Sequence, residues 1–384
     1  MRSHSVLSIA DLERGARRYL PSSVYGYVSG ASEDHSSLEA NRYAYAHWRF
    51  LPRPLRGMSN RSQSIHLFGA DYAAPLGISP MGAVALCRFD GDCILARVAH
   101  DANVPFVLSA ASTVPLERIV TINPDTWYQA YLPARHDVID PLLARVDAAA
   151  IRVLVITVDV PIASIRENEL RNGFSLPLRP SLRLVTSGLA RPRWLLGTFG
   201  KTLLRQGIPH FENFTAERGG PIIQSVKDDH RAGRAAMTWE HIRHIRDRWP
   251  GVLVLKGILR PEDARMAHSI GVDGIFVSNH GGRQLDGAIA SLDALPDIAR
   301  ATEATGMTLI IDGGIRRGTD VLKALALGAN AAFCGRPVLY GLAAGGQVLA
   351  AKALAVLKQE IDVNQALLGC DDVCKLNPEY LTAG

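Results

Sequence analysis

The stretch TLIIDGGIRRGTDVLKALALGANAAFCGR, residues 308–336, decides the fold class. It opens with an apolar run of strand length, passes through a glycine turn into an amphipathic segment of helical period, and ends in a second apolar run. Parallel neighbouring strands need a crossover connection, which is usually a helix. The stretch therefore predicts an α/β protein with a parallel sheet.

The same unit recurs along the chain from about residue 74. Helical patterns such as Pro261–Ile270 and Gly318–Leu327 separate the apolar runs. The runs are Pro75–Ser79, Phe106–Ala110, Trp127–Tyr131, Val153–Val158, Val252–Lys256, Gly274–Ser278, Thr308–Asp312 and Ala331–Gly335. This number of units matches a closed (β/α)8 TIM barrel. An open doubly wound sheet is the alternative, but its GxGxxG turn is missing.

Two segments fall outside the regular spacing. Residues 1–70 precede the barrel of residues 71–384, and their aromatic side chains predict an N-terminal extension packed on the outside of the barrel. Roughly ninety residues separate the fourth and fifth strands, far more than a usual connection, which predicts an insertion at about 174–237. A loop of this length is usually a lid or a binding segment.

Composition excludes several classes of protein. Apolar residues make up 47% and charged residues 21% of the chain, which excludes disorder and predicts a large core. The five cysteines form no CxxC pair, so neither a disulfide framework nor a metal site is expected. No signal peptide and no membrane-spanning run is recognisable. We therefore expect a cytoplasmic protein.

The positive charge is concentrated inside the insertion. No acidic residue lies between Glu169 and Glu212, and Lys and Arg residues gather there within the net charge of +5. Apolar residues at helical spacing in this interval are Leu195, Phe199 and Leu203. Residues 179–205 are thus a candidate for contact with an anionic membrane surface, on the inner face of the cell membrane. A lid, or a helix packed on the barrel or on another subunit, is slightly favoured over membrane contact, because Gly197 and Gly200 weaken an isolated helix. Without a binding motif, nucleic acid is not expected.

Polar residues gather at the predicted strand ends, where barrel enzymes place their reactive groups. His280 and Arg283 follow the sixth strand, so a titratable imidazole lies beside a group that can clamp a carboxylate. Asp159, after the fourth strand, can hold the other imidazole nitrogen. Lys256, at the end of the fifth strand, requires an anionic or polar partner. The alternatives are a structural histidine, a capping carboxylate and a simple salt bridge.

Glycine-rich turns follow the last two predicted strands. The turns Asp312–Gly318 and Gly335–Arg336 both carry arginine. Exposed backbone N–H groups and fixed positive charge suit a phosphate monoester, from a sugar phosphate or from the tail of a flavin mononucleotide. Alternatively, the glycines only make tight turns and the arginines face water.

Several of these segments together resemble one family. The segments are SNHGGRQLD at 278–286, LVLKG at 253–257, DGGIRRGTDVLKALALGA at 312–329 and GRP at 335–337. They resemble the FMN-dependent 2-hydroxy acid dehydrogenases and oxidases, whose members act on mandelate, lactate or glycolate. The likeness covers nearly the whole chain outside the insertion. WRF at 48–50, LYGLAA at 339–344 and NPEYL at 377–381 are most similar to the branch that oxidises mandelate.

The resemblance implies a function and a cofactor. It implies that FMN accepts electrons from a mandelate- or lactate-like (S)-2-hydroxy acid, which becomes the 2-oxo acid. Gly82 stands where oxidases often carry alanine, which favours a dehydrogenase that passes electrons to a quinone or protein acceptor. Met81 and Ser164-Ile165 depart from the usual pattern, which bears on flavin contacts and substrate choice. The resemblance also implies a homo-oligomer, a tetramer.

The resemblance further implies the site residues. The flavin ring and ribityl chain would be surrounded by Pro80, Met81, Gly82, Ser109, Gln129, Thr157, Lys256 and Ser278. The flavin tail and phosphate would be held by Asp312, Gly313, Gly314, Ile315, Arg316, Gly335 and Arg336. The substrate would be held by Tyr25, Tyr131, Arg166, His280 and Arg283, with His280, Asp159 and Tyr131 in the catalytic group. Lys256 would face the N1 and O2 edge of the flavin, where positive charge stabilises the reduced ring.

Other functions share part of this pattern. A flavin oxidase that makes hydrogen peroxide shares every motif and differs only in its electron acceptor. A flavin-free isomerase or aldolase acting on a phosphorylated substrate would use the same phosphate turns, but it would not need His280 and Arg283 together with Arg166. A binding protein that has lost catalysis would not need them either. A hydrophobic 2-hydroxy acid is the favoured substrate.

Overall fold

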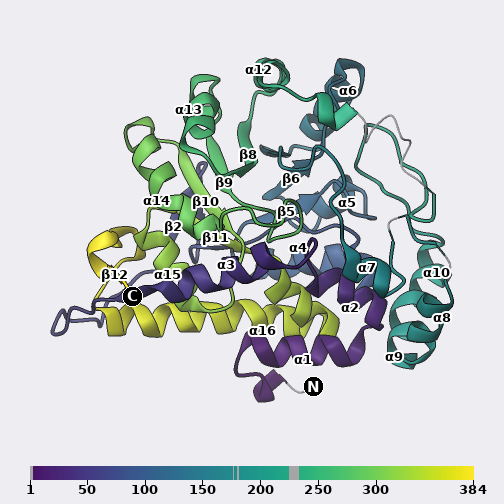
Figure 1. The fold of residues 1–384 in the computed structure, drawn as a ribbon, viewed down its shortest axis with the longest axis horizontal. Coiled ribbons are helices and arrows are strands. Elements are labelled where there is room, and N and C mark those ends of the chain that lie inside the picture. The colour runs from purple at the N-terminus through teal and green to yellow at the C-terminus, as the bar shows by residue number, and fades with distance from the viewer. Residues whose placement is uncertain (1–2, 176, 180, 225–232) are drawn as a thin grey trace.

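A closed barrel of eight parallel strands forms the centre of the protein (Figure 1). The computed structural model describes residues 3–175, 177–179, 181–224 and 233–384. The strand order around the barrel is β10-β11-β4-β5-β6-β7-β8-β9. The bounds are β4 Leu76–Ile78, β5 Phe106–Ser109, β6 Thr126–Ala130, β7 Val153–Thr157, β8 Val252–Ile258, β9 Gly274–Val277, β10 Thr308–Asp312 and β11 Ala331–Cys334. The predicted TIM barrel is confirmed, and each of its strands overlaps a predicted run.

Helices surround the barrel and cover its outer face. They are α4 Gly91–Ala102, α5 Leu116–Val120, α6 His136–Ala148, α12 Trp239–Arg248, α13 Pro261–Ser269, α14 Ser291–Thr302, α15 Gly318–Ala326 and α16 Arg336–Leu368. Strands covered on both faces must be apolar throughout, which is why they appear in the sequence as unbroken apolar runs. The parallel register pairs Thr157 with Lys256, so the polar ends of β7 and β8 lie at one level.

An aromatic layer fills the barrel interior. The Phe333 ring lies 5.5 Å from Trp127 and 5.0 Å from Phe276, measured between ring centroids. Gly77 on β4 leaves the space that Phe333 occupies, because a Cβ atom at Gly77 would lie 2.4 Å from that ring. At the other end of the barrel, the hairpin of β2 (Ile65–Leu67) and β3 (Ala70–Tyr72) brings Phe68 against Trp127.

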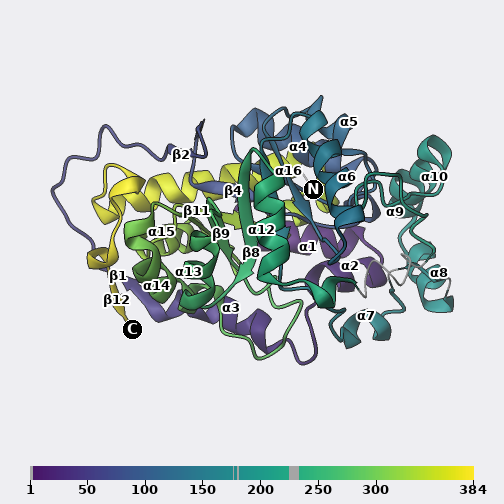
Figure 2. The ribbon, with the colours of Figure 1, turned by 90° about the horizontal axis from the view of Figure 1, so that it is seen from above.

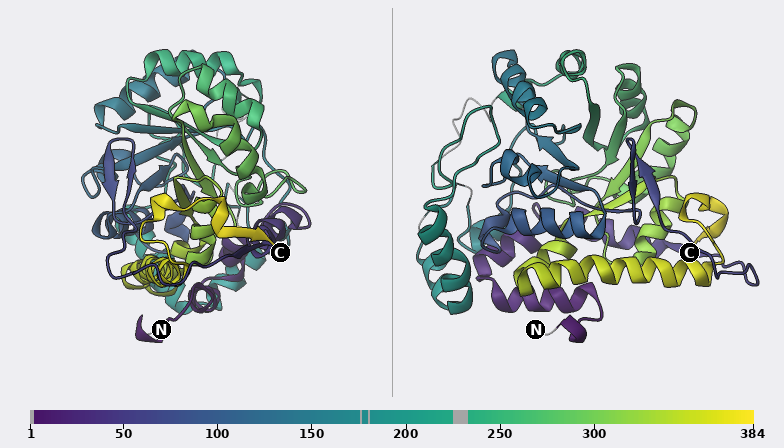
Figure 3. Two further views of the ribbon diagram at one scale, coloured as in Figure 1. Left: turned by 90° about the vertical axis from the view of Figure 1, so that its left-hand side faces the viewer. Right: turned by 180° about the vertical axis from the view of Figure 1, so that it is seen from behind.

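The two ends of the chain pack together along one side of the barrel (Figures 1 and 3). The N-terminal helices are α1 Ile9–Tyr19, α2 Ser22–Ser29 and α3 Ser36–His47. Helix α1 runs beside the long C-terminal helix α16, and β1 (Trp48–Phe50) pairs antiparallel with β12 (Leu381–Ala383). This arrangement brings α2 and α3 close to the carboxyl ends of the barrel strands.

Part of the insertion projects from the side of the barrel (Figures 1 and 2). Its described α-helices are α8 Leu182–Leu189, α9 Pro192–Trp194 and α10 Lys201–Gln206, and a π-helical stretch, Leu195–Gly200, joins α9 to α10. The short helix α7, Glu167–Arg171, precedes the insertion. Residues 176, 180 and 225–232 of the predicted insertion lie outside the described residues.

One described helix, α16, is long and apolar enough to cross a membrane by length and composition. Of its most apolar window, 61% is buried inside the protein, and the helix is kinked at Gly345 and Gly346. It packs against α1, α4 and α15, so its apolar composition is explained by its place in the core.

We expect Gly77→Ala to destabilise the protein by about 1–3 kcal/mol, because the new methyl group would force the Phe333 ring out of the aromatic layer. Chemical denaturation followed by circular dichroism would measure the loss. Gly188→Ala is the matched control, since its Cβ would lie 3.6 Å from Trp194, an ordinary contact. A Gly77→Ala variant as stable as the parent would contradict this account of the barrel interior.

Candidate active site

A cavity opens at the carboxyl ends of the barrel strands. Its wall is formed by the ends of β4, β8, β10 and β11, by the loop after β9, and by α2. The predicted site residues that line it are Pro80, Met81, Gly82, Tyr131, Arg166, Lys256, His280, Arg283, Asp312, Gly313, Gly314, Ile315, Arg316, Gly335 and Arg336. Residues from almost the whole length of the chain therefore meet in one place.

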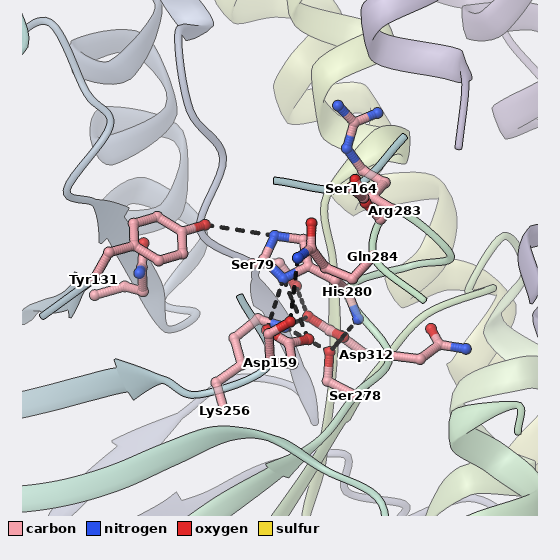
Figure 4. Close-up of polar contacts among 12 residues, drawn as sticks. Ser79, Tyr131, Asp159, Ser164, Lys256, Ser278, His280, Arg283, Gln284 and Asp312 are labelled. Atoms are coloured by element: carbon pink, nitrogen blue, oxygen red, sulfur yellow. Dashed lines mark hydrogen bonds and ion pairs between the residues drawn. The ribbon is translucent and has the colours of Figure 1, made fainter. Parts of the chain in front are cut away.

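A buried charge network forms the floor of the cavity (Figure 4). The Lys256 ammonium lies 2.8 Å from an Asp312 carboxylate oxygen and donates to the Ser278 hydroxyl at 2.6 Å. Ser278 in turn donates to Asp312 at 2.5 Å, and Ser79 also donates to Asp312, at 3.1 Å. Only 3% of Lys256 is exposed, so Asp312 is the anionic partner that the sequence requires for this lysine.

The network keeps the Asp312 carboxylate charged. Burial alone would raise the pKa of Asp312. The charge of Lys256, with hydrogen bonds from Lys256 and Ser278, outweighs burial and holds this pKa below its ordinary value. Lys256 and Asp312 thus form an ion pair at neutral pH, which leaves a fixed ammonium beside the cavity.

His280 lies at the cavity wall between two polar partners (Figure 4). Its Nδ1 lies 3.0 Å from an Asp159 carboxylate oxygen, and its Nε2 lies 3.4 Å from the Tyr131 hydroxyl. Because an ionised carboxylate only accepts hydrogen bonds, the proton of the neutral imidazole belongs on Nδ1. Nε2 is then free to accept a proton on the cavity side. Burial raises the pKa of Tyr131, so its hydroxyl stays protonated.

Two arginines share one buried carboxylate at the mouth of the cavity. Arg283 donates to Glu169 at 3.0 Å, and a nitrogen of Arg166 lies 3.6 Å from the same oxygen. Arg283 also donates to the backbone oxygens of Tyr27 and Gly30. Burial and the neighbouring Arg283 lower the pKa of Arg166. A carboxylate ligand would relieve this concentration of positive charge. Glu169 was not among the predicted site residues.

The structure does not bring Tyr25, a predicted substrate residue, to the cavity wall. The Tyr25 hydroxyl points to Glu13, at 3.3 Å, and Tyr25 is not part of the cavity wall. Tyr27 lines the cavity instead, donates to the backbone oxygen of Gly82 at 3.1 Å and lies under the Arg283 guanidinium. Both tyrosines are on α2, where a separation of two residues turns side chains to different faces. Helical periodicity was the signal that could have separated them.

The end of the cavity formed by the turns after β10 and β11 is strongly basic. Arg336 donates to the backbone oxygens of Val28, Gly281 and Gly30. Burial and the nearby Arg316 lower the pKa of Arg336. Within the described residues, neither arginine has a carboxylate partner. With the adjacent backbone of Gly313–Ile315, this end suits a phosphate group.

Buried polar side chains at the ends of β5, β6 and β7 show whether the site fits a flavin. Ser109 donates to Gln129 at 2.9 Å, and both side chains are buried. The Gln129 Nε2 and Thr157 Oγ1 atoms are buried without a hydrogen-bond partner. Buried polar atoms are normally paired, so these two require a polar partner in the adjacent space. A flavin ring, with its carbonyl and N–H edge, supplies one, and the basic end accommodates the FMN phosphate.

Two further findings concern the chemistry available. No group of three or more His, Cys, Asp or Glu side chains in the described part of the chain is arranged to hold a metal ion. All five cysteines are free, and only Cys374 is exposed. The predicted residues Ser109, Gln129, Thr157, Ser278 and Asp159 are not among the residues that line this cavity, and Thr157 lines a second one.

Comparison with known proteins decides the family. The family model described as FMN-dependent dehydrogenase matches residues 16–383. The chain belongs to this family. (S)-mandelate dehydrogenase of Pseudomonas putida is 37% identical over 380 residues, which are 99% of this chain and 94% of the relative. L-lactate oxidase of Lysinibacillus sphaericus is 36% identical, covering 96% of this chain and 90% of the relative.

The fold of this chain is similar to that of a solved relative. A crystal structure of (S)-mandelate dehydrogenase, described as a monotopic membrane protein, matches with a TM-score of 0.88 and 36% identity, over 99% of this chain and all of the other. The family, the oxidoreductase class and the FMN cofactor predicted from the sequence are thereby confirmed.

We expect Asp312→Asn to lower the free energy of unfolding by about 3–5 kcal/mol, because it leaves the Lys256 charge buried without a partner. Asp371→Asn, which breaks an exposed pair with Lys375, should cost no more than about 1 kcal/mol. Denaturation of the FMN-loaded proteins would measure both. Equal losses in the two variants would contradict the central place given to the buried pair.

The same pair sets a pH dependence. Since the pKa of Asp312 is lowered from 3.8 in the folded protein, its stabilising contribution is complete above pH 3.8 and is lost as the pH falls through the folded value. The parent protein should therefore lose stability more steeply in this acid range than Asp312→Asn. Denaturation curves at a series of acid pH values would show it.

Proposed function

We propose that the protein oxidises an (S)-2-hydroxy acid to the 2-oxo acid, with His280 as the base and FMN as the electron acceptor. The observation that carries the proposal is the orientation of His280. Asp159 holds Nδ1, so Nε2 faces a cavity that also presents two arginines for a carboxylate. The names of the relatives, a mandelate dehydrogenase and a lactate oxidase, support this class of substrate.

The cofactor would be held along the barrel mouth. Gln129, Thr157 and Lys256 would contact the ring, while Gly313–Arg316 and Arg336 would hold the phosphate. The remaining predicted contacts, from Pro80, Met81, Gly82, Ser109, Ser278 and Gly335, come from the same strand ends. When bound, FMN supplies the acceptor for the two electrons that leave C2 of the substrate. The Lys256 charge would stabilise negative charge developing on the ring.

The substrate would bind between the arginines and the histidine. Arg166 and Arg283 would take its carboxylate by charge-assisted hydrogen bonds. His280 Nε2 would then remove a proton from C2 or from the C2 hydroxyl, and Asp159 would stabilise the imidazolium that forms. Tyr131 and Tyr27 would provide hydroxyls beside the reacting carbon. Apolar cavity residues, among them Met81, Ala111 and Leu339, suit a hydrophobic side chain such as that of mandelate.

We infer that the projecting insertion brings the enzyme to an anionic membrane, where a quinone or a protein would collect the electrons. The exposed apolar side chains between α8 and α10 are Leu182, Val185, Leu189, Leu196, Phe199, Leu203 and Leu204. The opposite face is fixed to the barrel and to α1, because Trp194 donates to the Leu86 backbone oxygen and Thr198 bonds to the Tyr19 hydroxyl. The apolar face is therefore turned outward among basic residues. The tetramer implied by the family stays a prediction.

The function is tested without oxygen. We expect (S)-mandelate to bleach the visible absorption of the FMN-loaded protein, because electrons pass to the flavin. His280→Gln should keep the flavin but slow bleaching by about 10²–10⁴-fold, since the base is lost. His100→Gln, on the outer helix α4, is the control. Stopped-flow absorbance measures the rates.

A flavin bleached by neither (S)-mandelate nor L-lactate would rule out the proposed reaction. Rapid return of colour in air would favour the oxidase alternative.

Membrane contact is tested by sedimentation with phosphatidylglycerol vesicles. We expect the parent protein to sediment with the vesicles and a Leu196→Glu, Leu204→Glu double variant to stay in the supernatant, because charge is placed on the outward face. Leu7→Glu, Leu55→Glu is the matched control, since both leucines are exposed elsewhere. If the two double variants sediment alike, the insertion is not the part of the protein that binds the vesicles.

A further inference from the structure

The loop that carries His280 has an unusual backbone. His280, Gly281 and Gly282 all have positive φ, at 59°, 63° and 76°. Glycine adopts this left-handed region freely, but a histidine does so at a cost of about 1–3 kcal/mol. A residue in such a conformation persists only where its surroundings hold it. Contacts from outside the loop must therefore hold His280 in this conformation.

The residue before His280 is held by a buried amide pair. Asn41 Nδ2 donates to Asn279 Oδ1 at 2.7 Å, and Asn279 Nδ2 donates back to Asn41 Oδ1 at 3.1 Å. Only 1% of Asn41 and 4% of Asn279 is exposed. Asn279 Oδ1 also accepts the backbone N–H of Gly282, at 3.2 Å. The pair thus holds the loop at Asn279, before His280, and at Gly282, after it.

Asn41 belongs to α3, which contacts the loop at two more points. The Asp286 carboxylate, at the end of the loop, accepts the backbone N–H groups of Ser36 and Ser37 at the start of α3. Gly282 lies directly on the helix, because a Cβ there would be 2.5 Å from the Leu38 nitrogen. A carboxylate at a helix N-terminus is favourable, so the loop and the helix stabilise each other.

The same helix also contacts the glycine turn after β10. A Cβ at Gly314 would lie 2.1 Å from the backbone oxygen of Asn41. The Tyr45 hydroxyl donates to the Gly313 backbone oxygen, and Lys323 donates to the Tyr45 backbone oxygen. Helix α3 is therefore wedged between the loop with the base and the turn at the basic end of the cavity.

We infer that Asn41 is a positioning residue for His280. This rests on the proposed function, in which His280 is the base. Asn41 contacts neither the cavity nor the imidazole. It acts through Asn279, whose side-chain amide bonds to Asn41 and to the Gly282 N–H and so fixes the backbone of the His280 loop. Loss of the pair lets residues 280–282 leave the left-handed conformation and turns Nε2 away from the reacting carbon.

The test uses the FMN-loaded protein and two readouts. Hydrogen–deuterium exchange measures the amides of residues 279–287, and anaerobic stopped-flow with (S)-mandelate measures the rate and the substrate Kd of flavin reduction. In Asn41→Ala we expect faster exchange confined to this loop. We also expect reduction slowed by about 10²-fold, because misplacement of about 1 Å has that effect, with Kd changed by less than about threefold. Arg42→Ala, exposed on the same helix, should leave both unchanged.

A second variant keeps the inference testable if Asn41→Ala does not fold. Asn41→Asp still accepts from Asn279 Nδ2 and from the Ser291 N–H but cannot donate to Asn279 Oδ1, so its effects should be intermediate. Exchange and reduction at parental values in either variant would overturn the inference. Exchange raised throughout the barrel with FMN lost would also overturn it, in favour of a general structural role. If the parent is not reduced by the acid, the proposed function fails, while the exchange data still test the loop.

Discussion

A lysine ammonium buried at the mouth of a closed barrel needs an anion beside it, and this requirement organises the site. Lys256 on β8 finds that anion in Asp312 on β10, with Ser278 at the end of β9 bonded to both. The ends of three strands are thus tied together by charge. Ser278 also accepts the backbone N–H of His280, at 3.0 Å. The same network therefore supports the loop that carries the base.

The remaining charges of the cavity form two neighbouring groups, since Arg283 of one and Arg336 of the other both donate to the Gly30 backbone oxygen. In one group Arg316 and Arg336 face the cavity without a carboxylate partner among the described residues, which suits the doubly charged phosphate of FMN. In the other, Glu169 balances part of the charge of Arg166 and Arg283, which leaves attraction for a single carboxylate. His280 and Lys256 line the same cavity, and the Gln129 amide is buried without a hydrogen-bond partner. The charge pattern matches a flavin lying across the barrel with an anionic substrate beside it.

Much of this could be predicted from local sequence, and some could not. The strands appear as apolar runs because both barrel faces are covered, and the reactive residues follow them because barrel strands end together. Tyr25 and Tyr27 cannot be distinguished by motif alone, because only the orientation of the short helix α2 turns Tyr27 to the cavity and Tyr25 to Glu13. Asn41 and Glu169 were missed for a different reason. Their roles depend on partners more than a hundred residues away, and no spacing pattern records such contacts.

The most direct test of the account is a crystal structure of the FMN-loaded protein with the 2-oxo product bound. It should show the FMN phosphate between Arg316 and Arg336 and the ring against Lys256. The product carboxylate should lie on Arg166 and Arg283, with His280 Nε2 facing C2. A product carboxylate bound away from both arginines, or an imidazole turned from C2, would contradict the assignment of base and substrate clamp.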